Sequence, residues 1–342
     1  MNARLLKRLS SMIAMLILSS CGYFGDLDYA APDPSICHAT EVIDGGFLCA
    51  LQPSMLARAA HDKDMQGSNS GFGFHAIGFP NNDATVRGIY LHLGGTSGRP
   101  YDQTTSEFPS RTWLSEAVDS GFIVIQLAYN NRFSVNGDQA CGGKGLAIND
   151  CAGLLRREKF SGKDDSTMTN TSPADSIQQR LITLIEYFAA RNYEFPIELV
   201  NDGIVNWNDL RIGGHSQGAG HALFIAKNYG AKSVCLLSGA YDIYDTIFRG
   251  EQPAIADWFI GDNSFLKQTT VRAMVSSQDT AYTGFQTAFN TLSLVKDIHW
   301  IDTDELDTII PPSGEFGPHA ATVKDPAYGG FRRTLCLYSP IE

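Results

Sequence analysis

One short stretch limits what this chain can fold into more than any other. In Arg211-Ile-Gly-Gly-His-Ser-Gln-Gly-Ala-Gly220 a serine stands among glycines, directly after a short apolar run. Residues 208–212 can lead into a β-strand. In residues 220–230 the apolar side chains are spaced as on one face of a helix, and Gly230 is expected to end that helix. Ser216 is therefore predicted to lie at a strand-to-helix corner rather than in a flexible loop.

The segment Gly214-His-Ser-Gln-Gly218 has the Gly-x-Ser-x-Gly spacing of a nucleophile elbow. A serine projected from so sharp a turn has a strained backbone, and glycines on either side avoid collisions with the neighbouring strand and helix. Gly220 is expected to let the helix approach the sheet closely. The turn also directs the first free N–H groups of the helix to the place where an oxyanion would form.

Apolar runs recur along the rest of the chain. They predict strands at residues 86–93, 122–128, 233–237, 271–275 and 297–301, with helices at 111–120 and 172–192. The second helix is expected to start with Ser172 as N-cap and Pro173 at its first position. This alternation predicts a mostly parallel sheet covered on both faces, with its site at the C-terminal ends of the strands.

With the string GHSQGAG between a strand and a helix, the chain resembles the serine α/β-hydrolases. The string is similar to the elbows of cutinase-type and other bacterial esterases, and the resemblance covers about residues 80–325. It implies an α/β-hydrolase fold and cleavage of carboxylic esters by a Ser-His-Asp triad through an acyl-enzyme. It implies no metal and no organic cofactor.

The resemblance also implies the chain order serine, acid, histidine. Of the histidines after Ser216, His221 is expected inside a helix and His299 inside a strand, which leaves His319 as the general base. Asp279, after the strand at 271–275, is the favoured acid, and Asp242 at the end of an earlier strand is the alternative. A strand-end aspartate that only caps a turn is the competing interpretation of both.

The oxyanion hole of the family uses the N–H after the nucleophile, here that of Gln217. The second N–H comes from a loop after an earlier strand. His92-Leu-Gly-Gly-Thr-Ser-Gly98 resembles the family's His-Gly-Gly-Gly loop, although Leu93 departs from it. Gly95 or Thr96 is the expected donor.

The substrate is expected to be a small-molecule or lipid-like ester, and the sequence does not specify its acyl or alcohol part. An acyltransferase or peptidase with the same triad, and a catalytically silent binding protein of the same fold, are the alternatives. The formal charge of −11 over 342 residues, without a basic cluster beyond the first residues, argues against nucleic acid as a partner.

The N-terminus has the order of an export signal. Arg4, Lys7 and Arg8 precede an apolar run at residues 12–18, and Leu18-Ser-Ser-Cys21 resembles the bacterial lipobox. The resemblance implies a signal peptide over residues 1–20, a lipidated Cys21 and a membrane anchor in the bacterial cell envelope. Residues 21–35 are then expected to form a tether to a single domain at 36–342.

The remaining cysteines are even in number, which in an oxidising compartment favours disulfides. Cys37–Cys49 and Cys141–Cys151 are the short-range choices. A zinc site lacks support, because neither Cys-x-x-Cys nor a paired histidine spacing is present. The second pair lies in residues 131–171, a long polar insertion that is expected to be a functional flap near the active site.

Overall fold

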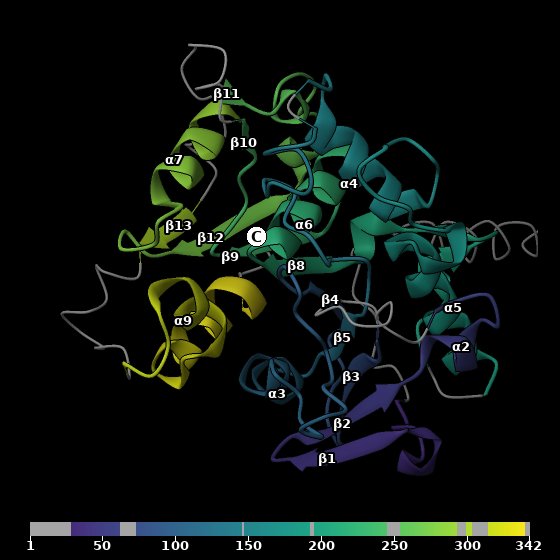
Figure 1. Cartoon of the computed structure of the whole chain (residues 1–342). Helices are drawn as coiled ribbons and strands as arrows, with labels where there is room; N and C mark the ends of the chain where they lie inside the picture. Colours follow the sequence, from purple (N-terminus) through teal and green to yellow (C-terminus); the bar gives the residue numbers. More distant parts are fainter. Residues whose placement is uncertain are drawn as a thin grey trace, which may run out of the picture.

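A central sheet organises the molecule (Figure 1). The structure, a computed structural model, describes residues 29–61, 73–145, 147–191, 195–244, 254–292, 299–302 and 314–338. The sheet has nine strands in the order β1-β2-β3-β5-β4-β8-β9-β12-β13. They are β1 (Ala39–Ile43), β2 (Gly46–Leu51), β3 (His75–Pro80), β4 (Ile89–Leu93), β5 (Ile123–Leu127), β8 (Arg211–His215), β9 (Ser233–Leu237), β12 (Thr270–Val275) and β13 (His299–Asp302).

Pairing is antiparallel from β1 through β2 and β3 to β5, and parallel from β5 across to β13. The expected mostly parallel sheet is confirmed. Short two-stranded pairs lie outside it: β6 (Val200–Asn201) with β7 (Ile204–Val205), and β10 (Ile243–Tyr244) with β11 (Ala254–Ile255).

Helices cover both faces of the sheet, as predicted (Figure 1). The helices are α2 (Pro53–Leu56), α3 (Arg111–Asp119), α4 (Cys151–Ser161), α5 (Ile177–Ala189), α6 (Gln217–Tyr229), α7 (Tyr282–Thr291), α9 (Pro318–Lys324) and α10 (Gly329–Arg332). Helices α4, α5, α6 and α7 pack on one face, and α3 and α9 on the other. In the described part of the chain, no helix combines the length and the apolar character needed to cross a membrane.

Two hydrophobic cores result, because successive strand residues point to opposite faces. Leu91 and Ile125 belong to the core under α5 and α6, whereas Tyr90 and Val124 belong to the core under α3. Every residue of β4 and β5 is buried. Burial on both faces explains why these strands read as continuous apolar runs rather than alternating ones.

The beginning of the domain differs from expectation. The hairpin of β1 and β2 and the strand β3 add three antiparallel strands that the apolar runs did not predict. Residues 29–35, which the sequence assigns to a tether, contact the domain: the hydroxyl of Tyr29 donates to the carbonyl of Pro80 at 3.0 Å, and Asn82 accepts from the N–H of Ala31. Cys21 and the predicted signal peptide lie outside the described residues.

Two further expectations are corrected. Ser172 precedes a single 3-10 turn at Pro173–Asp175, and α5 begins after Ser176, whose hydroxyl accepts from the N–H of Gln179. Residues 131–171, for which the sequence predicted a polar insertion and no helix, contain α4. Its helical pattern is weak because it buries charged side chains, Arg156 among them, whose charges are matched inside the protein.

Candidate active site

Ser216 stands where β8 ends and α6 begins, as the sequence predicts. Its backbone has φ 55° and ψ −123°, the left-handed region that a serine rarely adopts. The turn is held from both sides, because the N–H of Ser216 donates to the carbonyl of Leu237 at 2.9 Å and its own carbonyl accepts from Ala219 at 3.0 Å. The corner thus presents the hydroxyl at the C-terminal edge of the sheet.

The glycines around Ser216 are required by close contacts. A Cβ on Gly214 would lie 2.3 Å from the backbone of Gly218, and one on Gly218 would lie 2.0 Å from the carbonyl of Leu93. Gly218 therefore brings the helix against the sheet, the role that the sequence assigned to Gly220. A Cβ on Gly220 would instead meet the guanidinium of Arg156 at 2.2 Å, so this glycine makes room for a buried charge.

His319 and Asp279 lie together at the same edge. His319 is near the start of α9, and its Nδ1 is 2.6 Å from Oδ2 of Asp279, in the turn after β12. A carboxylate only accepts, so Nδ1 carries the proton and Nε2 keeps a lone pair. The Asp279 side chain is 1% exposed and that of His319 is 42% exposed, so the imidazole reaches the surface whereas the carboxylate that it contacts is buried.

The environment keeps Asp279 ionised. Burial alone would raise the pKa of its carboxyl. Hydrogen bonds from His319 and from the N–H of Ala281, together with the electrostatic effect of the two histidine rings of His319 and His215, hold that pKa below its usual value. The same N–H contact forms the turn that sets the direction of the carboxylate. Asp279 therefore both shapes the turn and faces the histidine.

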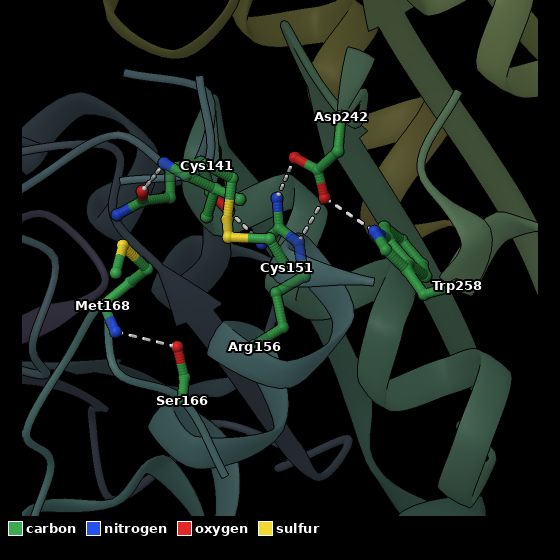
Figure 2. Close-up of a disulfide and its surroundings, with 9 residues drawn as sticks. Cys141, Cys151, Arg156, Ser166, Met168, Asp242 and Trp258 are labelled. Carbon is green, nitrogen blue, oxygen red and sulfur yellow. Dashed lines mark hydrogen bonds and ion pairs between the residues drawn. A yellow bond between two sulfur atoms is a disulfide. The ribbon is translucent and has the colours of Figure 1, made fainter. Parts of the chain in front are cut away.

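The other candidate acid, Asp242, is engaged elsewhere (Figure 2). Its two carboxylate oxygens accept from Nε and Nη2 of Arg156, each at 2.7 Å, and one also accepts from the indole of Trp258 at 2.7 Å. Arg156 and Asp242 are almost fully buried. A bidentate pair with a third donor occupies both oxygens of this carboxylate.

His215, directly before Ser216, was not predicted as a site residue. Its Nε2 is 2.9 Å from the carbonyl oxygen of His319, and since a carbonyl only accepts, Nε2 carries the proton. Burial lowers the pKa of His215 to about 4 despite that hydrogen bond, so the ring is neutral. His215 therefore ties the start of α9 to the elbow and fixes the position of His319.

The loop after β4 lies against Ser216. A Cβ on Gly95 would come within 3.0 Å of the Cβ of Ser216. Tyr129 donates to the carbonyl of Gly94 at 2.6 Å, and Asn131 donates to the carbonyls of Gly95 at 2.6 Å and Gly98 at 2.9 Å. In a trans peptide the N–H points opposite to the C=O. Anchoring these carbonyls therefore orients the N–H groups of Gly95 and Thr96.

A cavity of about 420 Å³ joins these parts. Ser216 and His319 both line it, with Gly95 and Thr96 from the loop. A hydrogen bond between Ser216 and His319 is absent from the contacts of the described residues, and such catalytic bonds often tighten only when substrate binds. Nowhere in the described chain do three histidine, cysteine or acidic side chains cluster closely enough to hold a metal ion.

A disulfide closes a loop within the insertion (Figure 2). Cys141 and Cys151 are bonded, as predicted, and so are Cys37 and Cys49; Cys235 and Cys336 form a third bridge. The side chain of Gln217 also accepts from the N–H of Val135 at 2.9 Å. The hydrogen bond from Val135 attaches the first part of the insertion to the start of α6.

Removal of the Cys141–Cys151 bridge should lower stability. The bond closes a separation of 10 residues, and in the chain-entropy model a loop of that length is worth ~2–3 kcal/mol. Urea denaturation of the Cys141→Ser/Cys151→Ser double variant is expected to show that loss in the free energy of unfolding. An unchanged denaturation midpoint would contradict the prediction.

Acid should destabilise the fold through its buried histidines. Burial lowers the pKa of His92 to about 3 and those of His75 and His221 well below the ordinary value of 6.5. Because the unfolded chain binds these protons more readily, their contribution is complete above about pH 6.5 and is lost as the pH falls toward 3. The free energy of unfolding is thus expected to fall from pH 7 to pH 4.

The His221→Phe variant tests the cause. Neither ring nitrogen of His221 has a hydrogen-bond partner in the described chain, and the ring packs edge-on to Tyr129 at 5.3 Å. Phenylalanine keeps an aromatic ring at this position and removes the nitrogen atoms that bind a proton. Urea denaturation from pH 7 to pH 4 should show a shallower loss for the variant, whereas equal slopes would refute the role of His221.

Comparisons with known proteins give loose structural likenesses. No protein-family model and no curated protein matches the chain. An S-formylglutathione hydrolase from Agrobacterium tumefaciens is similar at 14% identity and a TM-score of 0.41, over 77% of this chain and 88% of that one. The corresponding hydrolase of Staphylococcus aureus has 13% identity and a TM-score of 0.38, over 77% and 90%. Esterase B of Lactobacillus rhamnosis has 10% identity and a TM-score of 0.38, over 84% and 80%.

The fold follows from this chain's own features. A mostly parallel sheet with helices on both faces carries a Gly-x-Ser-x-Gly elbow at the C-terminal end of a central strand. The chain therefore has the α/β-hydrolase fold.

Proposed function

We propose that the protein is a serine hydrolase that cleaves carboxylic esters, with Ser216 as nucleophile, His319 as general base and Asp279 as the acid. The proposal rests on how three side chains are arranged. A strained serine and a histidine whose Nδ1 contacts a buried carboxylate at 2.6 Å line the same cavity. Serine needs such a base, since its hydroxyl is a weak nucleophile alone.

The proposed reaction has two halves. Nε2 of His319 takes the proton of Ser216 as Oγ attacks the carbonyl carbon, and then gives that proton to the leaving alcohol. Nε2 then takes a proton from water as the water attacks the acyl carbon, and returns it to Oγ of Ser216 as the acyl–oxygen bond breaks and the carboxylic acid product leaves. Asp279 holds the imidazole in the required tautomer and stabilises its cation. The N–H groups of Gln217 and of Gly95 or Thr96 are proposed to bind the oxyanion.

A fluorophosphonate probe tests the proposal directly. It should label the purified protein on one serine, Ser216, and the label should be lost in the Ser216→Ala variant. A silent binding protein of the same fold would remain unlabelled, and labelling of another serine would overturn the assignment. Release of nitrophenol from nitrophenyl acetate or butyrate, sensitive to the same substitution, is the matching assay.

We also propose that the mature protein begins at a lipidated Cys21 and is anchored in the bacterial cell envelope. The basic, apolar and lipobox segments support this, and disulfides are usual in exported proteins. Mass spectrometry of membrane fractions should find a diacylglycerol-modified Cys21 at the N-terminus, and Cys21→Ser should leave the precursor uncut. An unmodified N-terminus at another residue would refute the anchor.

A further inference from the structure

The cavity is lined by polar side chains that the proposed triad does not use. His92 of β4, Gln126 of β5 and Ser110 before α3 line it together, and the three are called the polar wall. His92 and Gln126 are directly opposite each other in the parallel register of β4 and β5, so their side chains lie on the same face of the sheet. Each is 1% exposed.

Much of the hydrogen-bonding capacity of the polar wall is unused. Both ring nitrogens of His92 and Oε1 of Gln126 are buried without a partner in the described chain. Gln126 uses only its amide nitrogen, which donates to the hydroxyl of Ser110 at 3.3 Å. Leaving buried polar atoms unpaired costs free energy, and at a cavity wall a ligand that hydrogen-bonds to them recovers that cost.

The polar wall lies close to the reacting groups. A Cβ on Gly94 would be 3.3 Å from the amide nitrogen of Gln126, so this side chain is directly behind the loop that faces Ser216. Gln126 and Ser216 line one cavity. A group of the substrate attached a few bonds from the scissile carbonyl can therefore reach the wall.

The charge of the wall limits what it can bind. Burial lowers the pKa of His92 to about 3, so the ring is neutral and has one N–H donor and one acceptor nitrogen. Oε1 of Gln126 adds an acceptor. A hydroxyl both donates and accepts and carries no charge, so it fits this set, whereas a hydrocarbon chain would leave every one of these atoms unpaired.

We propose that the ester cleaved at this site carries a hydroxyl group in the part that enters the cavity, and that His92 and Gln126 bind this hydroxyl. The inference rests on the proposed ester hydrolysis and narrows it. It favours hydroxylated esters over the lipid-like ones that the sequence left open. The hydroxyl belongs to the acyl part, as in a hydroxy acid, or to the alcohol part, as in a polyol or sugar.

Two matched pairs of esters distinguish these sources. Nitrophenyl 3-hydroxybutyrate is compared with nitrophenyl butyrate, and glycerol monoacetate with propyl acetate in a pH-stat. We expect kcat/KM for the hydroxylated ester to be about tenfold higher or more in one pair, the effect of at least one hydrogen bond to an otherwise unpaired buried group. The pair that shows it identifies the source.

Equal or lower kcat/KM for the hydroxylated ester in both pairs would overturn the inference while leaving ester hydrolysis in place. Failure to cleave any of these esters, with no fluorophosphonate label on Ser216, would instead overturn the proposed function.

A variant pair tests the residues. Gln126→Met keeps the length of the side chain and removes the amide, so the kcat/KM ratio of hydroxylated to parent ester should fall about tenfold. Gln179→Met makes the same change at an exposed position of α5 and should leave the ratio unchanged. A folded Gln126→Met protein with the wild-type ratio would contradict the assignment. The comparison of esters on the wild-type protein stands even where this variant does not fold.

Discussion

Replacement of Ser216 by alanine is expected to abolish ester hydrolysis while the protein stays folded. The hydroxyl is the proposed nucleophile, and loss of a triad member typically costs ~10⁴-fold or more in rate. The strained turn is held by backbone hydrogen bonds, which alanine preserves. Nitrophenyl butyrate turnover and a thermal melt on the same preparation measure both parts of the prediction.

Ser264→Ala is the matched control, since Ser264 lies on an exposed turn where its hydroxyl donates to Asp262. It should retain wild-type turnover. A well-folded Ser216→Ala protein with near-normal turnover would show that the nucleophile has been placed wrongly.

The position of Ser216 at a strand-to-helix corner could be predicted because the elbow is formed by residues that are adjacent in the sequence. Its glycines, the strand before it and the helix after it are contiguous in the sequence, so their spacing marks the turn even though Leu93 and Leu237 supply contacts from other strands. His319 required chain order as well, because nothing in its own neighbourhood distinguishes it. Its position at the start of a helix rather than in a loop did not follow from either argument.

Residues that act across long separations could not be found in this way. Asn131 orients the loop at residues 94–98, and His215 holds the carbonyl of His319, yet neither belongs to a recognisable spacing. The Cys235–Cys336 bridge joins residues 101 apart. Such contacts exist only once the sheet has brought distant segments together, so sequence pattern carries no trace of them.

Helix α4 was not predicted from the sequence, for a different physical reason. A sequence of charged residues normally indicates a solvated surface, but Arg156 is paired with Asp242, and Glu158 accepts from the backbone N–H groups of Ser166 and Thr171. Burial with internal partners removes the polar face on which helical periodicity depends. The same pairing of Arg156 with Asp242 is the reason why Asp279 is proposed as the acid.

The substitutions Asp279→Asn and Asp242→Asn are expected to have different kinds of effect. An amide at position 279 no longer stabilises the imidazolium of His319 and no longer selects its tautomer, so turnover should fall ~10⁴-fold. The fold should persist, because the amide oxygen still accepts from the N–H of Ala281. Turnover and urea denaturation of the two variants, measured side by side, provide the comparison.

The main effect of Asp242→Asn should be a lower free energy of unfolding. Asparagine leaves the buried guanidinium of Arg156 without its opposite charge, and breaking a buried pair from one side costs ~3–5 kcal/mol. Arg156 also donates to the carbonyl of Gln217 at 3.3 Å, so a loosened Arg156 would disturb the elbow and lower turnover indirectly. At temperatures where Asp242→Asn is folded, its turnover should therefore remain far above that of Asp279→Asn. A stable, inactive Asp242→Asn protein beside an active Asp279→Asn protein would reverse the assignment, because only the catalytic acid loses rate without losing stability.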